Sequence, residues 1–168
     1  GQVGARYNAS LWSGYAHLLA GKPGSARDAF EQLAEINDTW PTTFLHRARG
    51  QLEVGAIERA AELAGECLER TPGRMVRARA LAILGLATGL GDPDRSSEAE
   101  DLICEAISLT GGLGLLPYLA EAQQFLAELL HRRGEEERAG YYAARAAEGF
   151  ANCNMPGHAD DARRLRDT

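Results

Sequence analysis

Histidine and cysteine side chains are the first candidates for chemistry in this sequence, because they ligate metals and act as bases or nucleophiles. They are His17, His46, His131 and His158, and Cys67, Cys104 and Cys153. No two histidines have the spacing of a helical zinc motif, and no two cysteines form a CxxC pair. The sequence therefore predicts no catalytic residue, no metal site and no cofactor. We expect partly exposed packing histidines and small, buried, reduced cysteines, as in a cytoplasmic protein.

Two short segments have part of the pattern of a ligand-binding loop. Gly21-Lys22 begins like a phosphate-binding loop, but Pro23 stands where that loop needs Ser or Thr. Residues 92–98 alternate acidic and hydroxyl side chains as calcium loops do, but Ser97 occupies the position of the required glycine. Both segments are predicted to be turns, the second with Ser96 or Ser97 capping the next helix.

Charge and hydropathy exclude two classes of partner. The net charge of -6 repels phosphate backbones, so no nucleic-acid partner is expected. The local clusters at Arg74, Arg77 and Arg79 and at Arg163, Arg164 and Arg166 are interpreted as solvated helix faces. No apolar run reaches the length of about 18 residues that a membrane span needs, so no membrane association is expected.

The elements that position these side chains are predicted to be helices throughout. Ala, Leu, Glu and Arg, which are good helix formers, dominate the stretches between breakers. All six prolines stand between segments with helical apolar periodicity, where proline begins a helix or follows one. The predicted helices are 5–20, 24–37, 41–54, 57–70, 74–90, 95–110, 116–133, 136–151 and 157–166. Because the connections are short, consecutive helices must fold back as antiparallel neighbours.

The turns and the small residues that follow them recur with a fixed period. Gly21 and Gly55 stand 34 positions apart, and so do Ala26 and Ala60. This is the period of the tetratricopeptide repeat, which the chain resembles at the small and large apolar positions of each helical hairpin. The residues that carry the resemblance are Gly14, Ala26 and Phe30; Phe44, Ala48, Ala60 and Pro72; Ala99, Ile103 and Ala106; and Ala127, Ala139, Ala143 and Ala146.

The resemblance implies an all-α fold, an α-solenoid of about four antiparallel hairpins with a C-terminal capping helix. Residues 1–168 are expected to form a single domain with repeats at about 5–38, 41–71, 74–110 and 116–152 and a cap at 157–166. A small residue lets the two helices of a hairpin approach closely, and each hairpin then stacks on the next one.

The family's geometry also implies a concave groove, lined by the first helix of each hairpin. Its expected partner-binding residues are Asn8, Leu11, Tyr15, Thr42, Leu45, Arg49, Gln124, Glu128, His131 and Arg132, with Leu18, Leu52 and Leu81 as either groove or core residues. In the first helix only Asn8 suits the family's clamp for acidic peptide tails, so tail capture of that kind is not expected.

The sequence therefore predicts a non-catalytic protein–protein interaction scaffold. Its degenerate repeats resemble those of larger bacterial signalling or transcription-regulatory proteins, and because it begins with Gly1 we expect a segment of such a protein. The partner would be a protein or peptide segment, including other domains of the same parent chain. Two alternatives stay open: a structural spacer that self-associates as a homodimer, and a regulatory domain that senses a small ligand.

Overall fold

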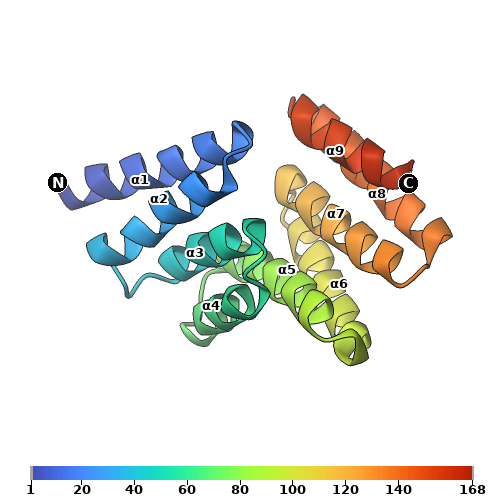
Figure 1. Cartoon of the computed structure of the whole chain (residues 1–168), viewed down its shortest axis with the longest axis horizontal. Coiled ribbons are helices and arrows are strands. Elements are labelled where there is room, and N and C mark those ends of the chain that lie inside the picture. Colours follow the sequence, from blue (N-terminus) through green and yellow to red (C-terminus); the bar gives the residue numbers. More distant parts are fainter. Residues whose placement is uncertain (1, 168) are drawn as a thin grey trace.

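The fold is a left-to-right succession of antiparallel helices with no strand in residues 2–167, the part of the chain that this computed structural model describes (Figure 1). Its helices are α1 (Gln2–Leu19), α2 (Pro23–Ile36), α3 (Pro41–Glu53), α4 (Ile57–Glu69), α5 (Arg74–Gly91), η1 (Pro93–Arg95), α6 (Ser96–Gly112), α7 (Leu116–Arg132), α8 (Glu136–Asn152) and α9 (Pro156–Arg166). Successive helices pair as hairpins, and α9 packs on α8. The predicted α-solenoid with a terminal helix is confirmed.

Glycines in the left-handed conformation make the turns after α1, α3 and α7. Gly21, Gly55 and Gly134 have φ values of 65°, 75° and 74°, in the left-handed region where glycine carries no steric penalty. Gly114, with φ 67°, makes the turn between α6 and α7 in the same way. Gly91 differs, because it is the last residue of α5 and takes no such conformation.

The turn after α5 is built on an aspartate side chain. The Asp94 amide donates to the Asp92 carboxylate at 3.0 Å and begins the short helix η1. The prediction that Ser96 or Ser97 caps the next helix is wrong. The residue before α6 is Arg95 without a side-chain cap, and the buried Ser96 hydroxyl has no hydrogen-bond partner within residues 2–167. The acidic side chain is closer to the turn and satisfies its amide first.

Small residues lie where paired helices come closest. Ala26, Ala60 and Ala99 have no exposed surface, and Ala139 retains 2%. At the α5–α6 crossing, a Cβ added to Gly85 would lie 2.6 Å from the Ile103 side chain and 2.8 Å from the Ala99 carbonyl oxygen. The helices therefore approach to backbone contact, as the repeat pattern predicts.

We expect Ala60→Leu and Ala139→Leu each to lower the free energy of unfolding by about 1–3 kcal/mol, because neither position has room for a larger side chain. The thermal midpoint should fall by about 2–4 °C for each kcal/mol. Melts followed by circular dichroism would measure this beside Ala5→Leu, an exposed control on α1 that should change little. Equal tolerance at all three positions would show that the repeat alignment is wrong.

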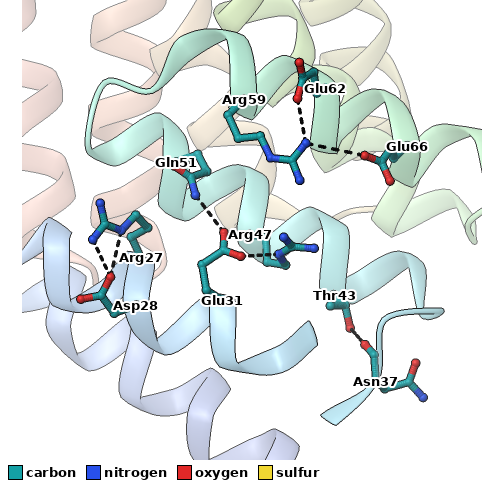
Figure 2. Close-up of polar contacts among 10 residues, drawn as sticks. All are labelled: Arg27, Asp28, Glu31, Asn37, Thr43, Arg47, Gln51, Arg59, Glu62 and Glu66. Carbon is teal, nitrogen blue, oxygen red and sulfur yellow. Dashed lines mark hydrogen bonds and ion pairs between the residues drawn. The ribbon is translucent and has the colours of Figure 1, made fainter. Parts of the chain in front are cut away.

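Polar contacts join the first two hairpins on the side shown in Figure 2. The Glu31 carboxylate of α2 accepts hydrogen bonds from Arg47, at 2.7 Å, and from Gln51, at 2.8 Å, both on α3. The Thr43 hydroxyl donates to the Asn37 carbonyl oxygen, which α2 leaves unpaired at its end, at 2.8 Å. These contacts link the second helix of the first hairpin to the first helix of the second.

Candidate functional site

A cavity of about 620 Å³ opens between the two ends of the array. The first helix of every hairpin contributes to its lining, as the repeat geometry predicts, and so does the segment that joins α8 to α9. Its apolar walls are Leu11, Trp12 and Leu19 from α1, Met75 from α5, and Phe150 and Met155 from the C-terminal end. Figure 1 shows α1 and α9 on opposite sides of the molecule. The walls therefore come from opposite ends of the sequence.

The base of the cavity is polar, and we call it the floor cluster: Tyr15, His46, Arg49, Arg79 and Glu121. Arg49 donates to the Glu121 carboxylate at 2.8 Å, and its second terminal nitrogen lies 2.5 Å from Glu53 at the edge. The exposed fractions of the Arg49 and Arg79 side chains are 13% and 7%. Two guanidinium groups are thus held in a largely dehydrated place, where charges interact strongly.

Arg79 is the less completely satisfied of the two arginines. Its Nη2 donates to the Tyr15 hydroxyl at 2.9 Å, and its guanidinium carbon lies 4.4 Å from the centre of the Tyr118 ring. Its Nε is 3.8 Å from a Glu121 oxygen, which is too long for a hydrogen bond. That Nε is buried and has no hydrogen-bond acceptor among residues 2–167. A buried donor left in this state is costly and calls for a partner.

A chain of hydrogen bonds joins Arg79 to His46 through Tyr15. Burial, only partly offset by Arg79, raises the pKa of Tyr15, so the phenol keeps its proton. The Tyr15 hydroxyl accepts from Arg79 and forms a second hydrogen bond with Nδ1 of His46, 3.0 Å away. Burial, followed by repulsion from Arg79, lowers the pKa of His46 to about 3. His46 is 6% exposed, so the expectation that every histidine is partly exposed is wrong at this position.

Stability should fall on acidification because of His46. Its pKa is about 3 in the folded chain, against the ordinary histidine value of 6.5. The unfolded chain therefore binds a proton that the folded chain excludes, and stability is lost as the pH falls from 6.5 toward 3. At pH 5 the loss from this residue is about 2 kcal/mol. Urea unfolding at pH 7 and pH 5 would measure it. The same pH dependence in wild type and His46→Gln would contradict this assignment.

The structure brings some of the predicted groove residues together and separates others. Leu11, Tyr15, Arg49 and Gln124 line the cavity, as does Leu18. The prediction that Leu45 lines the groove is wrong, because this residue is 1% exposed and belongs to the core. The lining position in this turn of α3 is the next residue, His46, which lies 34 positions after Trp12. Leu52 packs against the core and Leu81 is buried in it.

The remaining predicted residues lie away from the cavity lining. Asn8 is exposed on α1, and Thr42 accepts a hydrogen bond from Tyr7 at 3.2 Å. Further along the chain, Arg132 pairs with Glu128 at 3.3 Å and His131 with Glu136 at 2.9 Å.

Sequence reasoning missed Arg79, Glu121, Phe150 and Met155. Arg79 was expected on a solvated face with Arg74 and Arg77, and of these three only Arg79 is buried. The sequence signal for its burial was its position in a run of small and aliphatic residues, because the helix of such a run is enclosed by protein. For the two C-terminal residues the sequence gives no signal, since their approach to α1 depends on the curvature of the whole array.

The three cysteines are free thiols in different environments. Burial raises the pKa of the Cys67 thiol to about 11, and this thiol donates to the Pro41 carbonyl oxygen at 3.1 Å. Cys104 is exposed, contrary to expectation, and Cys153 is half-buried. Within the described part of the chain no cluster of three or more His, Cys, Asp or Glu side chains is placed to hold a metal ion. No helix of residues 2–167 is long and apolar enough to cross a membrane.

The fold and the lining together define an α-solenoid of the tetratricopeptide type with an internal cavity. Among solved structures the chain is similar to MamA, at 17% identity over 97% of this chain and 91% of that chain, with a TM-score of 0.53. It is similar to BtubC (BKLC) from P. vanneervenii, at 17% identity over 92% of this chain and 59% of that chain, with a TM-score of 0.53. No protein-family model and no curated protein sequence matches the chain. At these identities the similarity shows a shared fold.

Proposed function

We propose that this chain is a non-catalytic protein-interaction scaffold whose cavity holds an apolar helix or extended segment of a partner. The observation that carries the proposal is the exposure of large apolar side chains at the cavity mouth. Trp12 is 67% exposed, Leu19 76% and Met75 43%. Contiguous exposed apolar side chains around a concave site are typical of surfaces that bind protein segments.

The parent chain and the compartment form the finer part of this proposal. Residues 1–168 form one domain of four repeats and a cap within a larger bacterial signalling or transcription-regulatory protein, and other domains of that protein are among its candidate partners. Its three cysteines are free thiols, which favours a reducing cytoplasm.

Peptide selection would test the proposed groove. A displayed library of 12-residue peptides is selected on the wild-type chain, and the binders are measured against Trp12→Ser and Met155→Ser, one variant on each wall. Tyr141→Ser is the matched control, because Tyr141 is 57% exposed on α8 and does not line the cavity. We expect both wall variants to weaken binding at least about tenfold and the control to leave it unchanged. Binding that neither wall variant alters would overturn the groove.

Self-association is the second candidate, since the exposed Trp12 and Leu19 would also be covered in a homodimer. Light scattering over a range of concentrations separates the two functions. A dimer that dissociates on dilution, and that Trp12→Ser abolishes, would replace the scaffold proposal. A small-ligand sensor has less support, because a ligand within the cavity would leave the apolar residues at its mouth uncovered.

A further inference from the structure

The floor cluster contains more positive than negative charge. Both guanidinium groups face the same carboxylate, that of Glu121, whose side chain is 20% exposed. Glu121 is committed to Arg49 by a hydrogen bond of 2.8 Å and reaches Arg79 only at 3.8 Å. The second carboxylate, Glu53, lies at the edge with 31% of its side chain exposed, and it too pairs with Arg49. Arg79 is therefore left without a hydrogen-bonded anion.

Buried guanidinium groups require hydrogen-bond acceptors, and anionic acceptors most of all. A guanidinium has five N–H donors in a planar fork that fits a carboxylate. Arg79 lines the cavity with 93% of its side chain buried, donates to Tyr15, and keeps a buried Nε without an acceptor among the described residues. The positive field at this place is also felt by His46, whose imidazole stays neutral beside Arg79.

We infer that the groove selects a partner segment with one acidic side chain among apolar residues, and that the carboxylate of this side chain pairs with Arg79. The inference rests on the proposed function and names the chemistry of the partner. A neutral acceptor would satisfy the N–H groups, whereas a carboxylate would also give Arg79 the hydrogen-bonded anion that it lacks. Asp161, the third carboxylate at the cavity, is already paired with Arg164.

The position of the acidic residue follows from the walls. Leu11 and Leu18 of α1 lie on one side of the floor cluster, and Phe150 and Met155 lie on the other. A segment that fills the cavity places apolar side chains against both walls, and the residue between them faces Arg79. In a helical partner, apolar residues three or four positions before and after the acidic residue meet this requirement.

The test uses the selected 12-residue peptides as probes, with acetylated and amidated ends so that the only carboxylates are side chains. Peptides that depend on Trp12 and Met155 are remade with Glu→Gln or Asp→Asn and titrated against the wild-type chain. We expect the amide peptides to bind at least about tenfold more weakly, the loss that one charge-assisted hydrogen bond gives. Because the change is in the peptide, this comparison is independent of any effect on folding.

Two protein variants give a second readout. Arg79→Gln should bind the acid and amide peptides equally. Glu121→Gln removes the internal competitor and should tighten binding of the acid peptide while leaving the amide peptide unchanged, a gain that a purely structural role would not produce. Wall-dependent peptides that bind equally as acid and amide would overturn this inference and leave the scaffold standing. A selection that yields no wall-dependent peptide would overturn both.

Discussion

Replacement of Glu121 by leucine is expected to lower the free energy of unfolding by about 3–5 kcal/mol, because it leaves two buried guanidinium groups with no carboxylate between them. Arg49 would keep its ion pair with Glu53. Arg79 would keep only its hydrogen bond to the Tyr15 hydroxyl and its contact with the Tyr118 ring. Urea unfolding followed by circular dichroism measures the loss.

The control for this prediction is Glu62→Leu on α4, which removes a carboxylate from an ion pair with Arg59 at the surface (Figure 2). Its side chain is 60% exposed, and such pairs contribute less than about 1 kcal/mol. Adding Arg49→Met and Arg79→Met to Glu121→Leu should restore most of the lost stability, since the cost comes from unpaired charge rather than lost volume. Equal effects at Glu121 and Glu62 would show that the floor cluster is hydrated and energetically ordinary.

Phe30→Ala is expected to cost about 3–5 kcal/mol as well, through a different cause. Phe30 has no exposed surface, and a Cβ added to Gly14 would lie 2.2 Å from its ring, so the ring packs directly on the α1 backbone. Its ring centre also lies 5.3 Å from that of Tyr15 and 5.9 Å from that of His46. Truncation would leave a void beneath the floor cluster that the rigid helices cannot fill.

Trp12→Ala is the matched aromatic control, on the helix that Phe30 supports. Because Trp12 is 67% exposed, its loss should change the free energy of unfolding by less than about 0.5 kcal/mol while it weakens peptide binding. Thermal and urea unfolding of Phe30→Ala and Trp12→Ala would measure the two changes in the free energy of unfolding. A large loss of stability for Trp12→Ala would mean that this indole is a core residue and not part of a binding surface.

The helices could be predicted from the sequence because their causes are local. Proline at the first position of α2, α3 and α9 and at the second position of α7, and glycine after α1, α3 and α7, act on the residues beside them. The repeated alanines could be predicted because close approach of helices requires small side chains at fixed intervals. Both kinds of signal can be recognised in the sequence without knowledge of the tertiary structure.

The site was only partly predictable because its causes are not local. The pairing of Arg49 with Glu121 joins positions 72 apart, and nothing near either residue indicates the other. The alignment of the second repeat predicted the lining residue Arg49 but also the core residue Leu45, because a rotation of only 100° around the helix separates Leu45 from the lining residue His46. Arg79 was assigned to solvent because its charge was weighed without the helices that enclose it.

The distance between the wall formed by α1 and the wall formed by Phe150 and Met155 is set by every hairpin between them. In a repeat array each unit contacts only its neighbours, so small rotations at successive interfaces add up along the chain. The crossing angle of α5 and α6 at Gly85, remote from the cavity mouth, thus helps to set the width of that mouth. A segment bound to both walls would hold the two ends of the array at a fixed distance from each other. The elastic energy of the whole array then becomes part of the affinity, and a substitution far from the cavity can tune binding without touching the ligand.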